Sequence, residues 1–131
     1  MDGLKERGIS YISNRTVINN DAVMFDIDDT LIFTSGRLNV PIYELLIIAK
    51  RMGYKIIIIT ARPSFEAIVE LTRSQLQNFG IVYDYLGFTS HETKDNMKKA
   101  LGYNFVLSVG DMDTDLTHSQ HVLNTSNFYH S

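Results

Sequence analysis

The stretch that decides the fold is Ala22-Val23-Met24-Phe25-Asp26-Ile27-Asp28-Asp29-Thr30-Leu31, in which an apolar run ends in three carboxylates within four residues. The apolar part, from Ala22 to Phe25, is typical of a short strand that is buried on both faces of a sheet. Carboxylates this close repel one another, and such a group usually persists because a cation or a shared proton offsets the repulsion. The stretch therefore predicts a buried strand that leads into a metal site.

The three acids differ in the direction that an extended chain would give them. Successive side chains of a strand alternate, so we expect Asp26 and Asp28 to point to one side and Asp29 to the other. Asp26 and Asp28 are therefore the predicted working pair.

Strands and helices are predicted to alternate along the rest of the chain. The first 20 residues form a polar N-terminal arm that could hold a short helix over 4–12. The expected elements after the first strand are a helix over 41–52, a strand over 55–60, a helix that begins at an N-cap Ser64 and ends at Gly80, a strand within 83–89, a helix over 91–101 with Met97, Ala100 and Leu101 inward, a strand over 105–109, a short helix through 119 and a strand over 122–124.

This order predicts one α/β domain over residues 1–131, with a central parallel sheet between two layers of helices in a Rossmann-like arrangement. In the second helix, Ile68, Val69, Leu71, Leu76 and Phe79 are the expected apolar residues. Ligands of such sheets bind beyond the carboxyl ends of the strands. The chemically interesting side chains follow those ends or begin the late helix, namely Asp26, Asp28, Thr60, Ala61, Arg62, Lys94, Asp111 and Asp115.

Phe25-Asp26-Ile27-Asp28-Asp29-Thr30-Leu31 resembles motif I (DxDxT) of the haloacid dehalogenase superfamily, whose members are mostly phosphatases with an aspartyl nucleophile. Thr60, Lys94 and the pair Asp111 and Asp115 are similar to motifs II, III and IV, in that order. The resemblance covers roughly residues 23–116. Many relatives insert a cap domain after motif I, and the loop over 32–38 leaves no room for one, so the resemblance implies a capless core.

The resemblance implies a Mg²⁺-dependent phosphomonoesterase that forms an aspartyl-phosphate. Asp26 would be the nucleophile and a metal ligand. Asp28 would be the general acid and base, with its main-chain carbonyl on the metal, and crowding by neighbouring anions should raise the pKa of Asp28. Mg²⁺ prefers oxygen ligands and keeps several waters, so Asp111 is the second expected ligand. Asp115 would bind behind these ligands or through water, with Asp113 as its alternative.

The remaining predicted site residues would bind the phosphate. Thr60 would donate its hydroxyl to a phosphate oxygen, and Ala61 and Arg62 follow it in the same loop. Lys94 would neutralise charge on the phosphate and on Asp26, with Lys98 and Lys99 as nearby competitors for this role. Arg62 could fork onto a phosphate or a carboxylate, or simply pair with Glu66.

Two stretches narrow the resemblance further. Thr60-Ala61-Arg62-Pro63, and Leu101-Gly102-Tyr103 ahead of Gly110-Asp111, are similar to class B-type acid phosphatases (subfamily IIIB) and plant vegetative storage proteins. Asp113-Thr114-Asp115-Leu116 departs from their motif IV tail. The arginine after the motif II threonine also resembles the 3′-phosphatase domain of phage polynucleotide kinase, so a polynucleotide 3′-phosphatase or a nucleotidase is the alternative.

Composition limits the other classes of function. The 131 residues carry a net charge of −3 and no cysteine, and no apolar run reaches the length that spans a membrane. We expect a soluble cytoplasmic protein that has no membrane partner and meets nucleic acid only as a substrate. A zinc site is improbable, because no ligand pattern includes the histidines His91, His118, His121 and His130.

Two non-enzymatic classes remain beside the phosphatase: a phosphoaccepting receiver-like domain, and an inactive storage or interaction protein. A site without a cap is open. Openness favours a nucleotide or macromolecular phosphate, or closure by a second subunit of a homo-oligomer.

Overall fold

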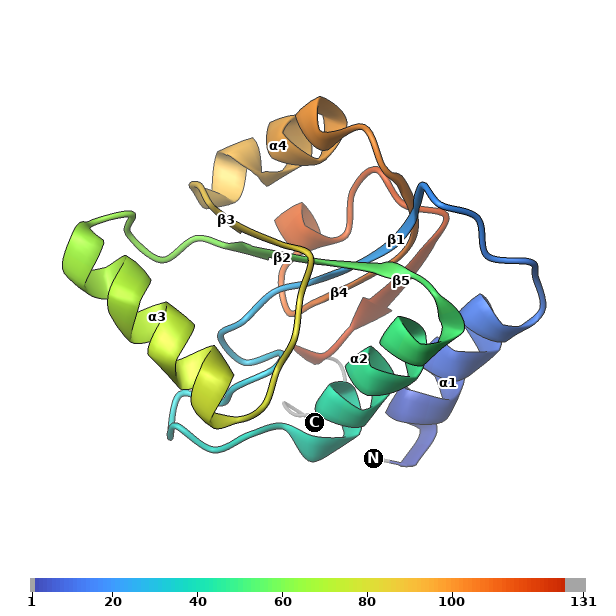
Figure 1. Ribbon diagram of the computed structural model, residues 1–131, viewed down its shortest axis with the longest axis horizontal. Helices are drawn as coiled ribbons and strands as arrows, with labels where there is room; N and C mark the ends of the chain where they lie inside the picture. Colours follow the sequence, from blue (N-terminus) through green and yellow to red (C-terminus); the bar gives the residue numbers. More distant parts are fainter. Residues whose placement is uncertain (1, 127–131) are drawn as a thin grey trace.

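The computed structural model, which describes residues 2–126, contains a sheet of five parallel strands in the order β3-β2-β1-β4-β5 (Figure 1). The strands are β1 (Asp21–Phe25), β2 (Lys55–Thr60), β3 (Tyr85–Phe88), β4 (Asn104–Gly110) and β5 (His121–Asn124). The helices are α1 (Asp2–Ser13), α2 (Val40–Met52), α3 (Glu66–Asn78) and α4 (Lys94–Leu101), with short 3₁₀ turns η1 (His91–Thr93) and η2 (Asp113–Asp115). The predicted α/β fold with a parallel sheet is confirmed.

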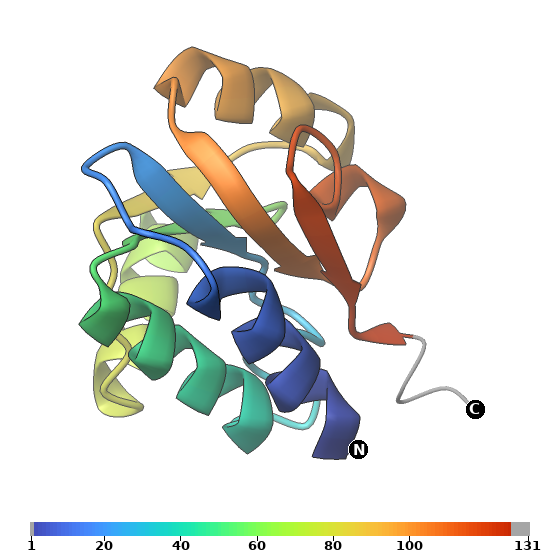
Figure 2. The same ribbon diagram turned by 90° about the vertical axis from the view of Figure 1, so that its right-hand side faces the viewer.

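Alternating side chains of the central strands build a separate apolar layer on each face of the sheet. On the face covered by α1, α2 and α3, the main core contains Val23, Phe25, Ile56 and Ile58. On the opposite face, α4 covers a smaller core that contains Ala22, Met24, Ile57, Ile59 and Phe105. Figures 1 and 2 show the three helices on one side of the sheet and α4 on the other. The fold therefore has three layers, with the thinner one around α4.

Helix α1 belongs to the main core. Its Leu4 and Ile12 are fully buried, and the helix packs against α2 and against strands β4 and β5. The sequence left open a short helix or an ordered arm for this segment, and the structure has a helix. None of the helices between residues 2 and 126 has the length and apolar character of a membrane span. Of the four histidines named above, His130 lies outside the described residues.

Strand β1 lies at the centre of the sheet, paired with β2 on one side and β4 on the other. Its carboxyl end is therefore flanked by the ends of both neighbours, and residues that follow these three strands meet at one edge. Between β1 and α2 the chain makes only a short looped connection, residues 26–39. The fold accordingly has no large cap at this edge.

Two local predictions about α3 and its entry are wrong. Ser64 is not the N-cap, because the chain stays extended through Phe65, whose carbonyl accepts bonds from the amides of Ile68 and Val69. Leu71 is 60% exposed, since α3 instead turns the residues Thr72 and Leu76 toward the sheet.

The inward face of α4 also differs from the prediction. Ala100 is exposed, because the helix turns Lys94 and Lys98, four residues apart, into the protein. Apolar periodicity could not reveal a buried face that is made of lysines. The short helix expected through residue 119 is only the turn η2.

Candidate active site

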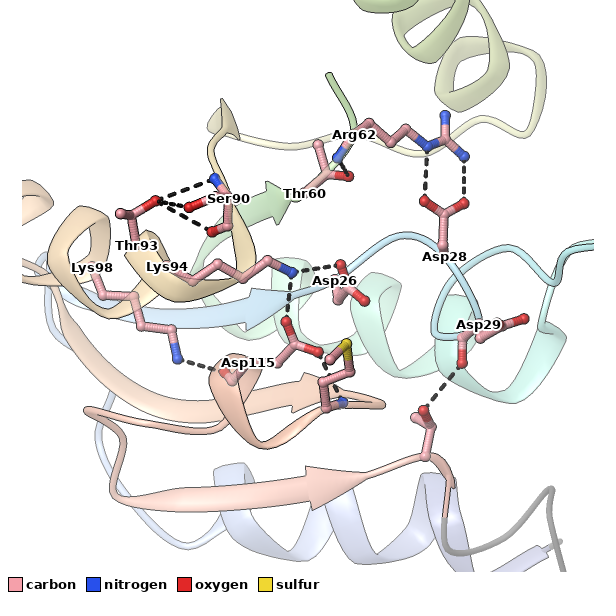
Figure 3. A network of polar contacts seen from close by, with 12 residues as sticks. Asp26, Asp28, Asp29, Thr60, Arg62, Ser90, Thr93, Lys94, Lys98 and Asp115 are labelled. Atoms are coloured by element: carbon pink, nitrogen blue, oxygen red, sulfur yellow. Dashed lines mark hydrogen bonds and ion pairs between the residues drawn. The ribbon is translucent and has the colours of Figure 1, made fainter. Parts of the chain in front are cut away.

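Asp26 is the first residue after β1, and its backbone amide donates to the carbonyl of Val109 on β4 at 3.0 Å. The residue is 5% exposed. Its carboxylate oxygen Oδ1 accepts a hydrogen bond from Lys94 Nζ at 2.9 Å, as Figure 3 shows. The central strand thus places one carboxylate at the middle of the sheet edge, in contact with a buried cation.

Lys94 is the first residue of α4 and is fully buried. Its Nζ also donates to Asp115 Oδ1 at 2.5 Å, while Asp115 Oδ2 accepts from the amide of Met112 at 3.1 Å. Burial alone lowers the pKa of Lys94, but the charges of Asp26 and Asp115 outweigh it and raise that pKa. The ammonium group is therefore a fixed positive charge between two acids.

Gly110 permits this arrangement. A Cβ atom at Gly110 would lie 2.3 Å from the Cβ of Asp115, closer than side-chain atoms approach. The chain after β4 folds back over this glycine and brings Asp115 beneath Lys94. The glycine of the motif IV stretch is thus required by a close approach rather than by a turn.

Asp26, Asp111 and Asp115 form a group of acids, with one carboxylate oxygen of each lying within 4.8 Å of the others. Burial, the charge of Asp115 and a hydrogen bond with Asp111 raise the pKa of Asp26 to about 8 against the opposing effect of Lys94. Burial, with the charge of Asp115, likewise raises the pKa of Asp111. Such a group needs a proton or a cation, and its oxygen atoms fit a hard divalent ion. Asp113 is exposed and lies outside the group.

The raised pKa of Asp26 predicts a pH-dependent effect on stability in the metal-free protein. A carboxyl group whose pKa rises on folding from 3.8 to about 8 contributes stability below 3.8, and this contribution is lost as the pH rises through 8. We expect Asp26→Asn, measured with chelator, to raise the melting temperature by roughly 10–20 °C more at pH ~9 than at pH ~4.

Asp84 is the control of opposite sign. Burial tends to raise its pKa, but the bonds from the Ile56 amide and Lys50 lower it overall. The ionised carboxylate of Asp84 therefore stabilises the folded state at pH values above the ordinary pKa of 3.8. Asp84→Asn should lower the melting temperature at high pH. An Asp26→Asn gain that does not change with pH would contradict the raised pKa.

Asp28 lies apart from the acid group and is held by Arg62. Arg62 Nε and Nη2 donate to the two carboxylate oxygens of Asp28 at 3.0 and 2.8 Å (Figure 3). Arg62 Nη1 donates to Thr72 Oγ1 and Gln75 Oε1 at 3.0 and 2.9 Å. Arg62 therefore forks onto a carboxylate, and its other nitrogen is anchored on α3. The guanidinium group of Arg62 thus pairs with Asp28 and not with Glu66, the other partner that the sequence allowed.

The expected directions of the acids are partly wrong. Strand β1 ends at Phe25, so the alternation of an extended chain does not continue, and Asp26 and Asp28 engage different cations. Asp29, in the left-handed region at φ 60°, lines the same cleft, and its Oδ1 accepts from the amide of Thr34 at 3.1 Å. The crowding that we expected at Asp28 falls on Asp26.

An open cleft of about 400 Å³ is lined by Arg62 and by four of the acids, Asp26, Asp28, Asp29 and Asp111. A second cavity of about 260 Å³ adjoins it and shares the stretch 61–63. Thr60 is buried below this stretch, and its hydroxyl oxygen accepts from the amide of Arg62 at 3.1 Å, which leaves the hydroxyl proton to be donated. The structure therefore provides space for a phosphate ester beside the predicted residues.

Sequence reasoning missed two residues of this region. His91 and Met112 line the cleft, and no motif pointed to either. Lys98 is fully buried beside the acid group but bonds to uncharged oxygens, while Lys99 is exposed and pairs with Asp95 at 2.9 Å. Of the three candidate lysines, Lys94 is the one that contacts Asp26.

No protein-family model matches the sequence, and no curated protein matches it significantly. Solved structures do match. A chain of a Pnkp1/Rnl/Hen1 complex has a TM-score of 0.68 and 22% identity over 87% of this chain. A class C acid phosphatase from Bacillus anthracis has a TM-score of 0.65 and 15% identity over 89%. A chain of a Pnkp1/Rnl/Hen1 RNA repair complex has a TM-score of 0.58 and 29% identity over 79%.

The chain spans 49%, 65% and 41% of these three proteins, respectively. At such identities the first two likenesses establish the fold alone. The chain has a Rossmann-like fold of the haloacid dehalogenase type, without a large cap. The predicted class B-type subfamily is not confirmed, since the acid phosphatase among these structures is of class C.

Proposed function

We propose that the protein is a Mg²⁺-dependent phosphomonoesterase that works through an aspartyl-phosphate on Asp26. The observation that carries this proposal is the contact of a central, buried Asp26 with Lys94 at the edge of an open cleft. The solved acid phosphatase and the RNA repair chains support a phosphatase-type hydrolase at a coarse level.

Phosphoryl transfer needs an in-line nucleophile and positive charge around the phosphate oxygens. A carboxylate oxygen of Asp26 would form the bond to phosphorus while the bond to the ester oxygen breaks. Lys94 would hold the Asp26 carboxylate in place and neutralise part of the charge, and Thr60 would donate its hydroxyl to the phosphate. Water would then displace phosphate from Asp26.

Asp28 would protonate the leaving alkoxide and later accept a proton from the attacking water. It lies on the wall of the cleft, its side chain is 51% exposed, and the two hydrogen bonds from Arg62 fix its direction. We therefore assign Arg62 a positioning role, in place of the phosphate contact that the sequence also allowed.

The acid group would hold the metal ion. Asp26 and Asp111 would provide carboxylate oxygens and Asp28 its main-chain carbonyl, while Asp115, bound to both Lys94 and the Met112 amide, would stand behind them. Mg²⁺, when bound, supplies positive charge for the phosphate oxygens. The bound cation would also keep Asp26 ionised at neutral pH, where the metal-free carboxyl favours a proton.

A second candidate is a polynucleotide 3′-phosphatase. It is favoured by the 29% identity to a chain of an RNA repair complex and by the second cavity that continues the cleft. A nucleotidase would use the same features. Closure of the open cleft by a second subunit and a cytoplasmic location stay predictions.

Turnover separates the proposed classes. Incubation with an aryl phosphate, with Mg²⁺ or with chelator, should give many phosphates per protein with Mg²⁺ only. A receiver-like domain would take up at most one phosphate, and a storage protein none. A further screen of nucleotides, 3′-phosphorylated oligonucleotides, phosphopeptides and sugar phosphates then assigns the substrate. The absence of turnover on every ester would overturn the proposal.

A further inference from the structure

Helix α4 buries a second lysine one turn after Lys94. Lys98 is 0% exposed, and its Nζ donates to three oxygens: Ser108 Oγ at 2.9 Å, the Asp115 carbonyl at 2.6 Å and the Thr117 carbonyl at 2.7 Å. The three protons of the ammonium group are thus all used. Figure 3 shows Lys98 reaching from α4 to the backbone of Asp115.

An ammonium group is a costly choice for this position. The three acceptors of Lys98 are uncharged, and burial lowers its pKa to about 8. Taking such an ion out of water costs several kcal/mol even after the structure relaxes. The neighbouring inward residues of α4, Met97 and Leu101, pack on the small apolar core. An apolar residue would fill position 98 at a lower cost in free energy. Core packing alone therefore does not explain why a lysine with three hydrogen bonds lies there.

The bonds hold the segment over 111–119, which contains the acids that follow β4. Asp115 is bound at its carboxylate by Lys94 and at its carbonyl by Lys98. Further along, the hydroxyl of Ser119 bonds to that of Ser108, the β4 residue that Lys98 also contacts. Lys98 therefore ties the middle of the segment to α4 and to β4.

We propose that Lys98 is a positioning residue, which fixes the segment of Asp111 and Asp115 and thereby sets the affinity of the acid group for a divalent cation. Lys94 binds the carboxylates of Asp26 and Asp115, and Lys98 binds the main-chain carbonyls of Asp115 and Thr117. The inference rests on the metal site of the proposed function. It goes beyond that function, because Lys98 touches neither the cleft nor the reacting groups.

Lys98→Met tests this role, with Lys99→Met as the matched control on the exposed side of the same helix. Calorimetric titration with Mg²⁺ should show about tenfold weaker binding for Lys98→Met, the usual effect of removing support behind a metal ligand, and no change for Lys99→Met. In the metal-free protein, amide hydrogen exchange over 111–117 should become faster in Lys98→Met, while exchange in β1 and β2 stays the same.

A Lys98→Met protein with unchanged Mg²⁺ affinity and unchanged exchange over 111–117 overturns the inference. Should this variant fail to fold, Ser108→Ala removes one acceptor, and about threefold weaker Mg²⁺ binding is expected from the loss of one hydrogen bond; unchanged affinity overturns the inference there. Wild-type protein that binds Mg²⁺ without hydrolysing any ester would refute the proposed function and leave this inference standing. If the wild type binds no Mg²⁺, the inferred link to metal affinity fails.

Discussion

Asp26→Asn abolishes Mg²⁺-dependent phosphate release, with an expected loss of about 10⁴-fold or more in turnover, as for other enzymes that lose their nucleophile. The amide has nearly the shape of the carboxylate, so the cleft keeps its form. It cannot attack phosphorus as a carboxylate does, and it gives Lys94 no negative charge to hold at 2.9 Å. Release of inorganic phosphate from an aryl phosphate, with and without Mg²⁺, measures the effect.

Asp113→Asn is the matched control. Asp113 is an acid of the same segment as Asp111 and Asp115, but it is exposed and lies outside their group. Its replacement removes one negative charge near the cleft and should leave turnover within about twofold of the wild type. Near-normal turnover in Asp26→Asn would show that Asp26 is not the nucleophile. A large loss in Asp113→Asn would show that Asp113, and not Asp115, is the second acid of motif IV.

The meeting of Asp26, Lys94 and Asp115 could be anticipated from the order of their motifs. Each follows the carboxyl end of a strand or begins a helix at that edge, and parallel sheets gather such positions. The close approach at Gly110 supports the same juxtaposition, because only a glycine lets Asp115 fold back over β4. Local chemistry and global topology agree at these positions, which makes them predictable.

Other features depend on contacts that no local pattern encodes. Ala100 is exposed because α4 turns Lys94 and Lys98 inward. The burial of these lysines depends on hydrogen-bond acceptors from the segment after β4. His91 lies in the turn η1 between β3 and α4, and its position at the cleft depends on how that connection folds. Such long-range bonds override the apolar periodicity from which helix faces are predicted.

The direction of the Asp28 side chain also depends on a contact that no local pattern encodes. Its alternation with Asp26 would hold only if the strand continued, and the chain turns instead after Phe25. The partner of Asp28 is an arginine 34 residues away, whose fork is anchored on Thr72 and Gln75 of α3. The sequence allowed a carboxylate partner for Arg62, and only the fold identifies which carboxylate it is.

Arg62→Lys should lower the turnover number by about 10²-fold while KM changes by less than about threefold. A lysine keeps the charge but lacks the planar fork, so it cannot hold both oxygens of Asp28 and also bond to α3. A misdirected general acid lowers the rate of the chemical step and not substrate binding. Steady-state kinetics measure both quantities, and Arg73→Lys, an exposed exchange on α3 with a surface partner in Glu70, is the control.

The choice of leaving group separates positioning from phosphate binding. A p-nitrophenolate leaves without much help from an acid, whereas an alkoxide needs a proton as the ester bond breaks. If Arg62 acts through Asp28, Arg62→Lys slows hydrolysis of an alkyl phosphate by at least about tenfold more than that of p-nitrophenyl phosphate. If Arg62 instead binds the phosphate, which both esters share, KM rises for both by the same factor and the two rates fall together. That second pattern would assign Arg62 to substrate binding and would show that the action of Asp28 does not depend on Arg62.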